Sequence, residues 1–103
     1  MAGPITITDG GYCEQTVNEQ KTYEFDFSTL NLPAGVELQT VGVFVITPSG
    51  VTQDNQVLVA GNRKTHVRLA CTTPGKYIIK NIVTTNESPT QTKDKRFTLG
   101  VKA

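Results

Sequence analysis

The sequence predicts an all-β domain, and three observations carry that prediction. Apolar and polar side chains alternate in short runs along most of the chain. These runs are separated by turn residues, such as Pro-Ala-Gly at 33–35 and Thr-Thr-Pro-Gly at 72–75. Apolar residues at helical spacing are hard to find anywhere. We therefore expect short strands joined by tight turns.

The clearest strand is expected over residues 21–27, because Tyr23, Phe25 and Phe27 alternate there with polar residues. Burying each of these aromatic side chains would stabilise the fold by about 1.5–3 kcal/mol. Residues 36–47 carry apolar side chains on both parities, which predicts a central strand, and Pro-Ser-Gly at 48–50 predicts a hairpin after it. Further strands are expected over residues 5–8, 56–60, 64–71, 76–85 and 95–101.

About seven strands, with turn residues every 8–12 positions or so, are typical of an immunoglobulin-like antiparallel β-sandwich. The chain has no tryptophan, so the Cys, Trp and Cys framework of antibody domains is missing and the likeness is architectural. An open barrel is the alternative. The polar first 19 residues, with two glycines at 10–11, predict an N-terminal arm that precedes a sandwich over residues 20–103.

Length and charge limit the classes of partner. With 103 residues the chain fits one domain. Its 10 Lys and Arg nearly balance its 9 Asp and Glu, so no net field attracts nucleic acid or an anionic membrane. The chain also lacks a basic, then apolar leader and any apolar run of about 20 residues. We therefore expect no nucleic-acid partner, no membrane span and synthesis in the cytoplasm.

The two cysteines, Cys13 and Cys71, lie far apart in the sequence and outside any metal-binding spacing. Two free thiols are the favoured interpretation, with a disulfide left open. Cys71 shares the apolar parity of its strand and is expected in the core, whereas Cys13 follows a polar stretch and is expected to be more exposed.

Few residues are candidates for catalysis. His66 is the one histidine, and it lies on the polar parity of its strand, which favours a solvated side chain over a general base. Glu24 and Asp26 form a carboxylate pair on one strand face, which we also interpret as solvated. No glycine-rich phosphate motif is present. We therefore expect no enzyme, no catalytic, metal-binding or cofactor-binding residue and no cofactor.

Three other surface features stand out. The glycosylation pattern at Asn86 is short enough to recur by chance and is discounted. Tyr12 is the one aromatic residue conspicuously free of a core parity. Two basic clusters are either footprints for an acidic protein surface or, as we favour, charges that keep strand edges apart. The clusters are Lys93, Lys95, Arg96 with Lys102, and Arg63, Lys64, Arg68.

Four segments together resemble the small immunoglobulin-like structural proteins of tailed bacteriophages, of the fibre-tail adaptor kind. They are YEFDFS at 23–28, LPAG at 32–35, YIIKNIVTT at 77–85 and DKRFTLGV at 94–101. The resemblance implies a virion structural protein that joins neck, tail or fibre components through protein–protein contacts, as a homo-oligomer in the particle. On this hypothesis residues 1–19 become ordered when the particle assembles.

Other classes remain open. A capsid decoration (cement) protein could use the same fold on the head lattice, with a much higher copy number. A carbohydrate-binding module would need exposed aromatic side chains, and here Tyr12 is the main candidate. A small hydrolase would have to act without a buried acid–base pair.

Overall fold

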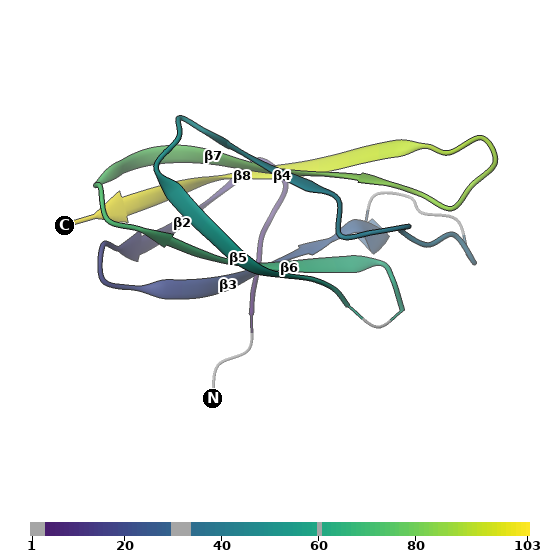
Figure 1. Cartoon of the computed structure of the whole chain (residues 1–103), viewed down its shortest axis with the longest axis horizontal. Helices are drawn as coiled ribbons and strands as arrows, with labels where there is room; N and C mark the ends of the chain where they lie inside the picture. The colour runs from purple at the N-terminus through teal and green to yellow at the C-terminus, as the bar shows by residue number, and fades with distance from the viewer. Residues whose placement is uncertain (1–3, 30–33, 60) are drawn as a thin grey trace.

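The computed structural model describes residues 4–29, 34–59 and 61–103, and they form two sheets packed face to face as a sandwich (Figure 1). The first sheet has the strand order β1-β3-β6-β5 and the second the order β2-β8-β7-β4. The all-β sandwich is thus confirmed, with eight strands where about seven were predicted. The elements are β1 (Ile5–Thr6), β2 (Gly11–Thr16), β3 (Gln20–Asp26), a 3₁₀ turn η1 (Phe27–Thr29), β4 (Val43–Thr47), β5 (Val51–Leu58), β6 (Lys64–Cys71), β7 (Gly75–Thr84) and β8 (Thr92–Lys102).

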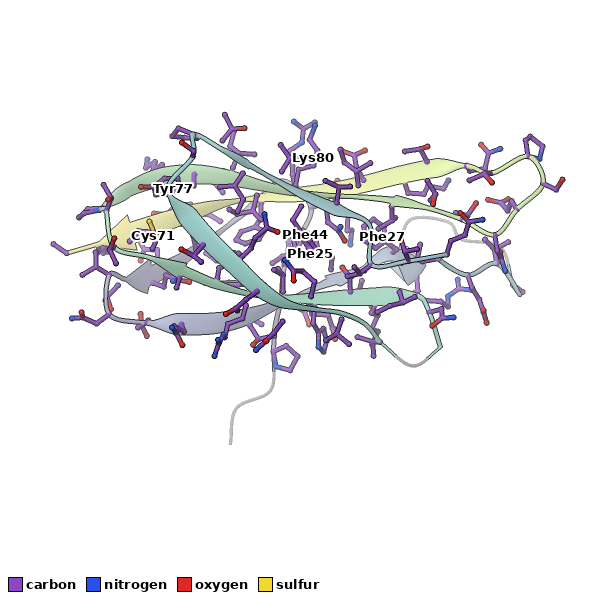
Figure 2. All side chains as sticks on the ribbon, in the orientation of Figure 1. Phe25, Phe27, Phe44, Cys71, Tyr77 and Lys80 are labelled. Carbon is purple, nitrogen blue, oxygen red and sulfur yellow. The ribbon has the colours of Figure 1, made fainter. Side chains whose placement is uncertain are left out.

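The core lies between the two sheets and is centred on aromatic rings. Tyr23 and Phe25 of β3 contact Phe97 of β8, with ring centroids 5.1 and 5.8 Å apart, and Phe25 meets Phe44 of β4 edge-on at 5.7 Å. Figure 2 shows Phe25 and Phe44 pointing toward each other between the layers. Aromatic pairs of this kind add about 0.5–1.5 kcal/mol each beyond the area they bury. The predicted inward face of residues 21–27 is confirmed.

The segment predicted as an N-terminal arm takes part in both sheets where the structure describes it. β1 pairs in parallel with β3, and β2 pairs in parallel with β8 over six residues. Between them Ile7 is buried in the core, and the chain crosses from one sheet to the other (Figure 1, purple). Residues 5–16 are therefore part of the sandwich, and the sheets are mixed rather than purely antiparallel. Sequence reasoning missed β2 because its apolar content is low.

The predicted central strand over residues 36–47 is wrong. The ladder with β7 begins only at Val43, and β4 is an edge strand. Its start is set by Gly42, which has φ +76° and lies so close to β7 that an added Cβ would be 2.2 Å from the Ile82 carbonyl oxygen. The apolar side chains Val43 and Val45, which suggested cover on both faces, are exposed on the outer face.

The predicted hairpin at 48–50 is also wrong, because this turn carries the chain from β4 in the second sheet to β5 in the first. A turn pattern indicates a reversal of direction but not the sheet that the next strand joins. Positions 32 and 33 of the predicted LPAG turn, position 60 of a predicted strand and residues 1–3 of the predicted arm lie outside the described residues.

Both cysteines are free thiols; Cys71 is buried and Cys13 is half-buried, as predicted. Burial raises the pKa of the Cys13 thiol. Helical structure in the described part of the chain is short, and none of it could reach across a membrane.

Candidate functional site: the three-loop end

Three connecting segments meet at one end of the sandwich, which we call the three-loop end. They are residues 34–42 between β3 and β4, residues 59 and 61–63 between β5 and β6, and residues 85–91 between β7 and β8. In Figure 1 this end lies on the right, and the chain terminus C lies at the opposite end. Because the segments come from both sheets, this end spans the full thickness of the sandwich.

The segment between β3 and β4 is attached to both other loops by backbone hydrogen bonds. Leu38 is buried, donates its N–H to the Asn62 carbonyl at 2.7 Å and forms an isolated β-bridge with Thr85. Gln39 donates its N–H to the Thr84 carbonyl at 2.9 Å. This segment therefore bridges the two hairpin loops.

Glu37 and Asn86 form a reciprocal pair across the same end. The Asn86 N–H donates to the Glu37 carbonyl at 2.8 Å, and the Glu37 N–H donates to Asn86 Oδ1 at 3.0 Å. Nearby, Arg63 Nη1 donates to the Val36 carbonyl at 3.0 Å. The predicted glycosylation position, Asn86, thus has its side-chain oxygen engaged in holding two loops together.

The loop between β7 and β8 is also closed within itself. The Thr85 N–H donates to the Gln91 carbonyl at 2.8 Å, and Thr85 Oγ1 accepts the Gln91 N–H at 3.1 Å while donating to Glu87 Oε1 at 2.9 Å. Thr85 is fully buried at the base of the loop. Its hydroxyl therefore fixes the base below the exposed residues 88–90.

A buried polar pair supports the three-loop end from below. Asn81 Oδ1 accepts a hydrogen bond from Thr65 Oγ1 of the opposite sheet at 2.6 Å. Asn81 Nδ2 donates to the carbonyls of Val41 and Val43 at 3.0 and 3.2 Å. Asn81 and Thr65 are fully buried, so the return of the chain into β4 is tied to both layers.

The surface of this end is made mostly of small and uncharged residues. Apart from Glu37, the exposed residues of this end in the described part are uncharged; they are Ala34, Gly35, Gln39, Thr40, Gly61, Asn86, Ser88, Pro89, Thr90 and Gln91. Within the described residues no group of three side chains could hold a metal ion. This arrangement can present to a partner three loops that hydrogen bonds already hold in place.

The structure places His66 and Glu24 together on the outer face of the first sheet, where β6 pairs with β3. His66 Nε2 lies 2.9 Å from Glu24 Oε2, and Thr6 Oγ1 donates to Glu24 Oε1 at 3.0 Å. Burial opposes ionisation of Glu24, but the hydrogen bonds from His66 and Thr6 outweigh it, so the pKa of Glu24 is lowered. His66 was predicted to be solvated, and the structure corrects this, because it is half-buried and paired with a residue 42 positions away.

Asp26 and Lys95 lie near the end of β3. Burial opposes ionisation of Asp26, but hydrogen bonds from the Ser28 side chain and N–H lower the pKa of Asp26 overall. Lys95 is buried, and its ammonium group donates to the Asp26 carbonyl at 2.8 Å. Lys95 therefore cannot belong to a docking footprint, although its position in a basic cluster suggested one.

Two other predicted basic residues are paired within the chain. Arg68 makes two hydrogen bonds to the Asp54 carboxylate, at 2.9 and 2.7 Å, and the hydrogen bond from Arg68 is the main reason that the pKa of Asp54 is lowered. Lys102 Nζ lies 3.2 Å from Glu14 Oε2. The two predicted basic clusters do not form one basic surface, because Arg68 lies on the first sheet and Lys102 on the second.

Tyr12, predicted to be free, is half exposed, but its phenol lies across Gly100 of the neighbouring strand β8 and donates to Glu14 Oε2 at 3.0 Å. A Cβ on residue 100 would be 2.0 Å from the Tyr12 hydroxyl oxygen, so the absence of a side chain at Gly100 makes room for this ring. Tyr12 lies on β2 opposite Thr98, six residues along β8 from the start of that strand at the three-loop end.

Comparison with protein-family models and with curated proteins returned no match. Among solved structures, the chain is similar to the cysteine protease inhibitor EhICP2 of Entamoeba histolytica, with a TM-score of 0.59 and 10% identity over 95% of this chain and 92% of that one. It is also similar to the solution structure of amebosin, with a TM-score of 0.46 and 13% identity over 98% of this chain and 100% of that one.

These comparisons correct the function predicted from the sequence. The solved structure similar to this chain with a TM-score of 0.59 is a cysteine protease inhibitor and not a tail or fibre adaptor of a bacteriophage virion. The predicted phage adaptor, with capsid decoration or carbohydrate binding as its alternatives, is therefore wrong on this finding. Short segments of alternating residues recur in many sandwiches, and a shared fold does not imply a shared function.

Proposed function

We propose that this chain is a protein inhibitor of cysteine proteases, and that its three-loop end blocks the active-site cleft of the protease. The observation that carries the proposal is the bracing of this end. Loops from both sheets are joined by the Leu38–Asn62, Gln39–Thr84 and Glu37–Asn86 hydrogen bonds.

Bracing matters because a loop that enters a protease cleft is normally a substrate. A substrate loop must open and straighten around the scissile bond, whereas the loop at 85–91 is tied at its base by Thr85 and from the side by Glu37. Ordering flexible side chains and loops on binding costs about 0.5–1.5 kcal/mol for each immobilised side chain. A loop set that is already ordered avoids most of this cost and resists the distortion that cleavage requires.

The small, uncharged residues among those exposed at this end support the same proposal. A cleft admits a narrow edge, and Gly35, Gly61 and Ser88 add little bulk there. The similarity to EhICP2 covers nearly all of both chains, so the same kind of sandwich carries the loops of a known inhibitor. At 10% identity the contact residues are not transferred from that protein.

The proposed inhibition is reversible and non-covalent. Cys71 is buried at the end of β6 that lies away from the three-loop end, and Cys13 lies on β2 beside Leu99. Neither thiol is therefore placed to exchange with the catalytic cysteine of a protease. Affinity would come from shape and from backbone hydrogen bonds at the loops.

The test is an inhibition assay against a panel of purified cysteine proteases, with serine proteases as a comparison class. Wild-type protein should inhibit at least one cysteine protease reversibly and should remain intact on electrophoresis after prolonged incubation. Ser88→Arg with Thr90→Arg places two bulky charges on the loop tip and should raise the inhibition constant at least tenfold.

The matched control is Ser49→Arg with Thr72→Arg, which makes the same kind of change in exposed turns at the opposite end. This control should inhibit like wild type. Absence of inhibition across the panel, cleavage of the 85–91 loop at a substrate-like rate, or equal weakening by both double variants would contradict the proposal.

A further inference from the structure

An exposed apolar patch lies on the outer face of the second sheet, along its β4 edge. Val43 and Val45 of β4 and Ile78 of β7 are exposed, and Ile82, which pairs with Val43, is half-buried. Lys80 pairs with Val45 in the ladder, and Figure 2 shows its side chain pointing away from the sandwich on this face. Clustered apolar side chains of this kind on a surface mark a site of association.

β4 differs from the other edge strands in its lack of protection. β1 has only two residues. β2 carries the charged side chain of Glu14, which lies 3.2 Å from Lys102 Nζ. β5 has a register shift between Asp54 and Val57, with Asn55 at φ +52°. These are the devices that keep an edge from pairing with another chain.

The backbone of β4 is arranged to accept another strand. Gln53 Nε2 of β5 donates to the Phe44 carbonyl at 3.2 Å. The Ile82 carbonyl points at β4, since a Cβ on Gly42 would be 2.2 Å from its oxygen, so its ladder partner Val43 faces β7 and the N–H and C=O of Phe44 face the open edge. Because N–H and C=O groups alternate sides along a strand, those of Ile46 face the same way. The strand has no charged residue and no proline at Val43–Thr47 to oppose pairing.

We propose that two copies of this chain associate through β4, antiparallel about a twofold axis at Val45, to form one continuous eight-stranded sheet. In this register the backbone N–H and C=O of Phe44 form hydrogen bonds with those of Ile46 in the second copy. The twofold axis repeats these bonds between Ile46 and the second copy's Phe44, so the backbone groups that face the edge are paired. The Phe44 carbonyl has a second lone pair, so it can keep its bond to Gln53.

A second copy suits this edge electrostatically. The nearest cation of the patch, Lys80, lies on β7, so three strand spacings separate it from the second copy's Lys80. At about 4.8 Å per spacing that is about 14 Å, which exceeds the Debye length of about 8 Å at physiological salt. On the outer face Val45 meets the second copy's Val45, with Cβ atoms about 4.5–5.5 Å apart.

This arrangement goes beyond the proposed inhibition and does not depend on it. The twofold axis runs through the middle of β4, so the two three-loop ends point in opposite directions. Each remains open to a partner, and the dimer is bivalent.

Sedimentation equilibrium of the full chain over a range of micromolar concentrations tests the proposal. We expect wild type to be dimeric in the upper part of that range, because a single edge strand gives a small and weak interface. Val45→Lys should weaken the dimer at least a hundredfold by placing two lysines face to face. Val57→Lys is the matched control on the bulged edge of β5, where valine is similarly exposed, and it should remain dimeric.

A mixture of Val45→Lys and Val45→Glu chains fixes the register. If residue 45 of one chain faces residue 45 of the second copy, lysine and glutamate attract each other in the mixture, which then forms a dimer that neither variant forms alone. Circular dichroism of each variant confirms that it stays folded. A wild type that is monomeric throughout the range, a dimer that survives Val45→Lys, or a mixture that fails to associate would overturn the proposal; in the first case the patch would serve a different protein.

Discussion

Replacing Asn81 by leucine tests whether the buried polar pair holds the three-loop end in place. Leucine has the same branched skeleton of four side-chain heavy atoms but offers no hydrogen-bonding group. The change removes the bond from Thr65 Oγ1 at 2.6 Å and the two bonds to the carbonyls of Val41 and Val43 at 3.0 and 3.2 Å. Because Asn81 is fully buried, water cannot readily replace these partners.

The magnitude follows from the number of bonds lost. Three hydrogen bonds at about 1 kcal/mol each give about 3 kcal/mol, and the fully buried Thr65 hydroxyl, left without its partner, raises its own share from about 1 to as much as about 3 kcal/mol. We therefore expect Asn81→Leu to lower the free energy of unfolding by about 3–5 kcal/mol. A domain of this size has about 5–15 kcal/mol of stability, so the variant should still fold.

Urea unfolding measures this loss, and a double-mutant cycle assigns it. Thr65→Val should cost less than Asn81→Leu, because it removes one bond rather than three. The double variant should lose about 1 kcal/mol less free energy of unfolding than the sum of the two single variants, because the Thr65 hydroxyl and its acceptor on Asn81 are removed together. Amide exchange at Gly42 and Val43 should also accelerate more than exchange in β6. A loss below about 1 kcal/mol, or strict additivity, would refute the reasoning.

Two further predictions concern single positions. Gly42→Ala should lower the free energy of unfolding by about 2 kcal/mol or more, measured by urea unfolding, because the new Cβ would lie 2.2 Å from the Ile82 carbonyl oxygen and alanine would be strained at this positive φ. Gly61→Ala introduces the same backbone strain with no atom near the new Cβ, so it should lower the free energy of unfolding by less. Equal losses in the two variants would count against a close approach at Gly42. Glu24→Gln should lower the urea midpoint near neutral pH, because hydrogen bonds from His66 and other partners lower the pKa of Glu24 in the folded state. The Glu24 carboxylate therefore stabilises the fold above its unfolded pKa, and this stabilisation is lost as the pH falls through the folded pKa. The difference from wild type should therefore shrink below about pH 4.3, and a difference independent of pH would contradict this origin.

The sequence was a good guide wherever burial follows alternation. Tyr23, Phe25 and Phe27 are buried as predicted, and so are Val67, Leu69 and Cys71 on β6. The strand predicted over residues 64–71 has the observed bounds, and the last strand differs by three residues or fewer at each end. Period-two patterning succeeds here because one face of each strand meets the opposite sheet.

The sequence was a poor guide to polar residues that find partners across strands. His66 and Glu24 are 42 positions apart, and Lys95 reaches the carbonyl of Asp26, 69 positions away. Each lies on a strand whose bounds were predicted closely, but its partner depends on which strands are neighbours. Local spacing holds no information of that kind, so paired groups were interpreted as solvated.

Alternation and turn residues in the sequence by themselves determined that this protein is an all-β sandwich and which faces of its main strands are buried. Tertiary structure alone decided that residues 5–16 join both sheets, that β4 lies at an edge, and that three loops meet at one end. The physical reason is that side-chain alternation is a property of neighbouring residues, whereas strand order and loop convergence are set by pairings as distant as Gly11 with Phe97.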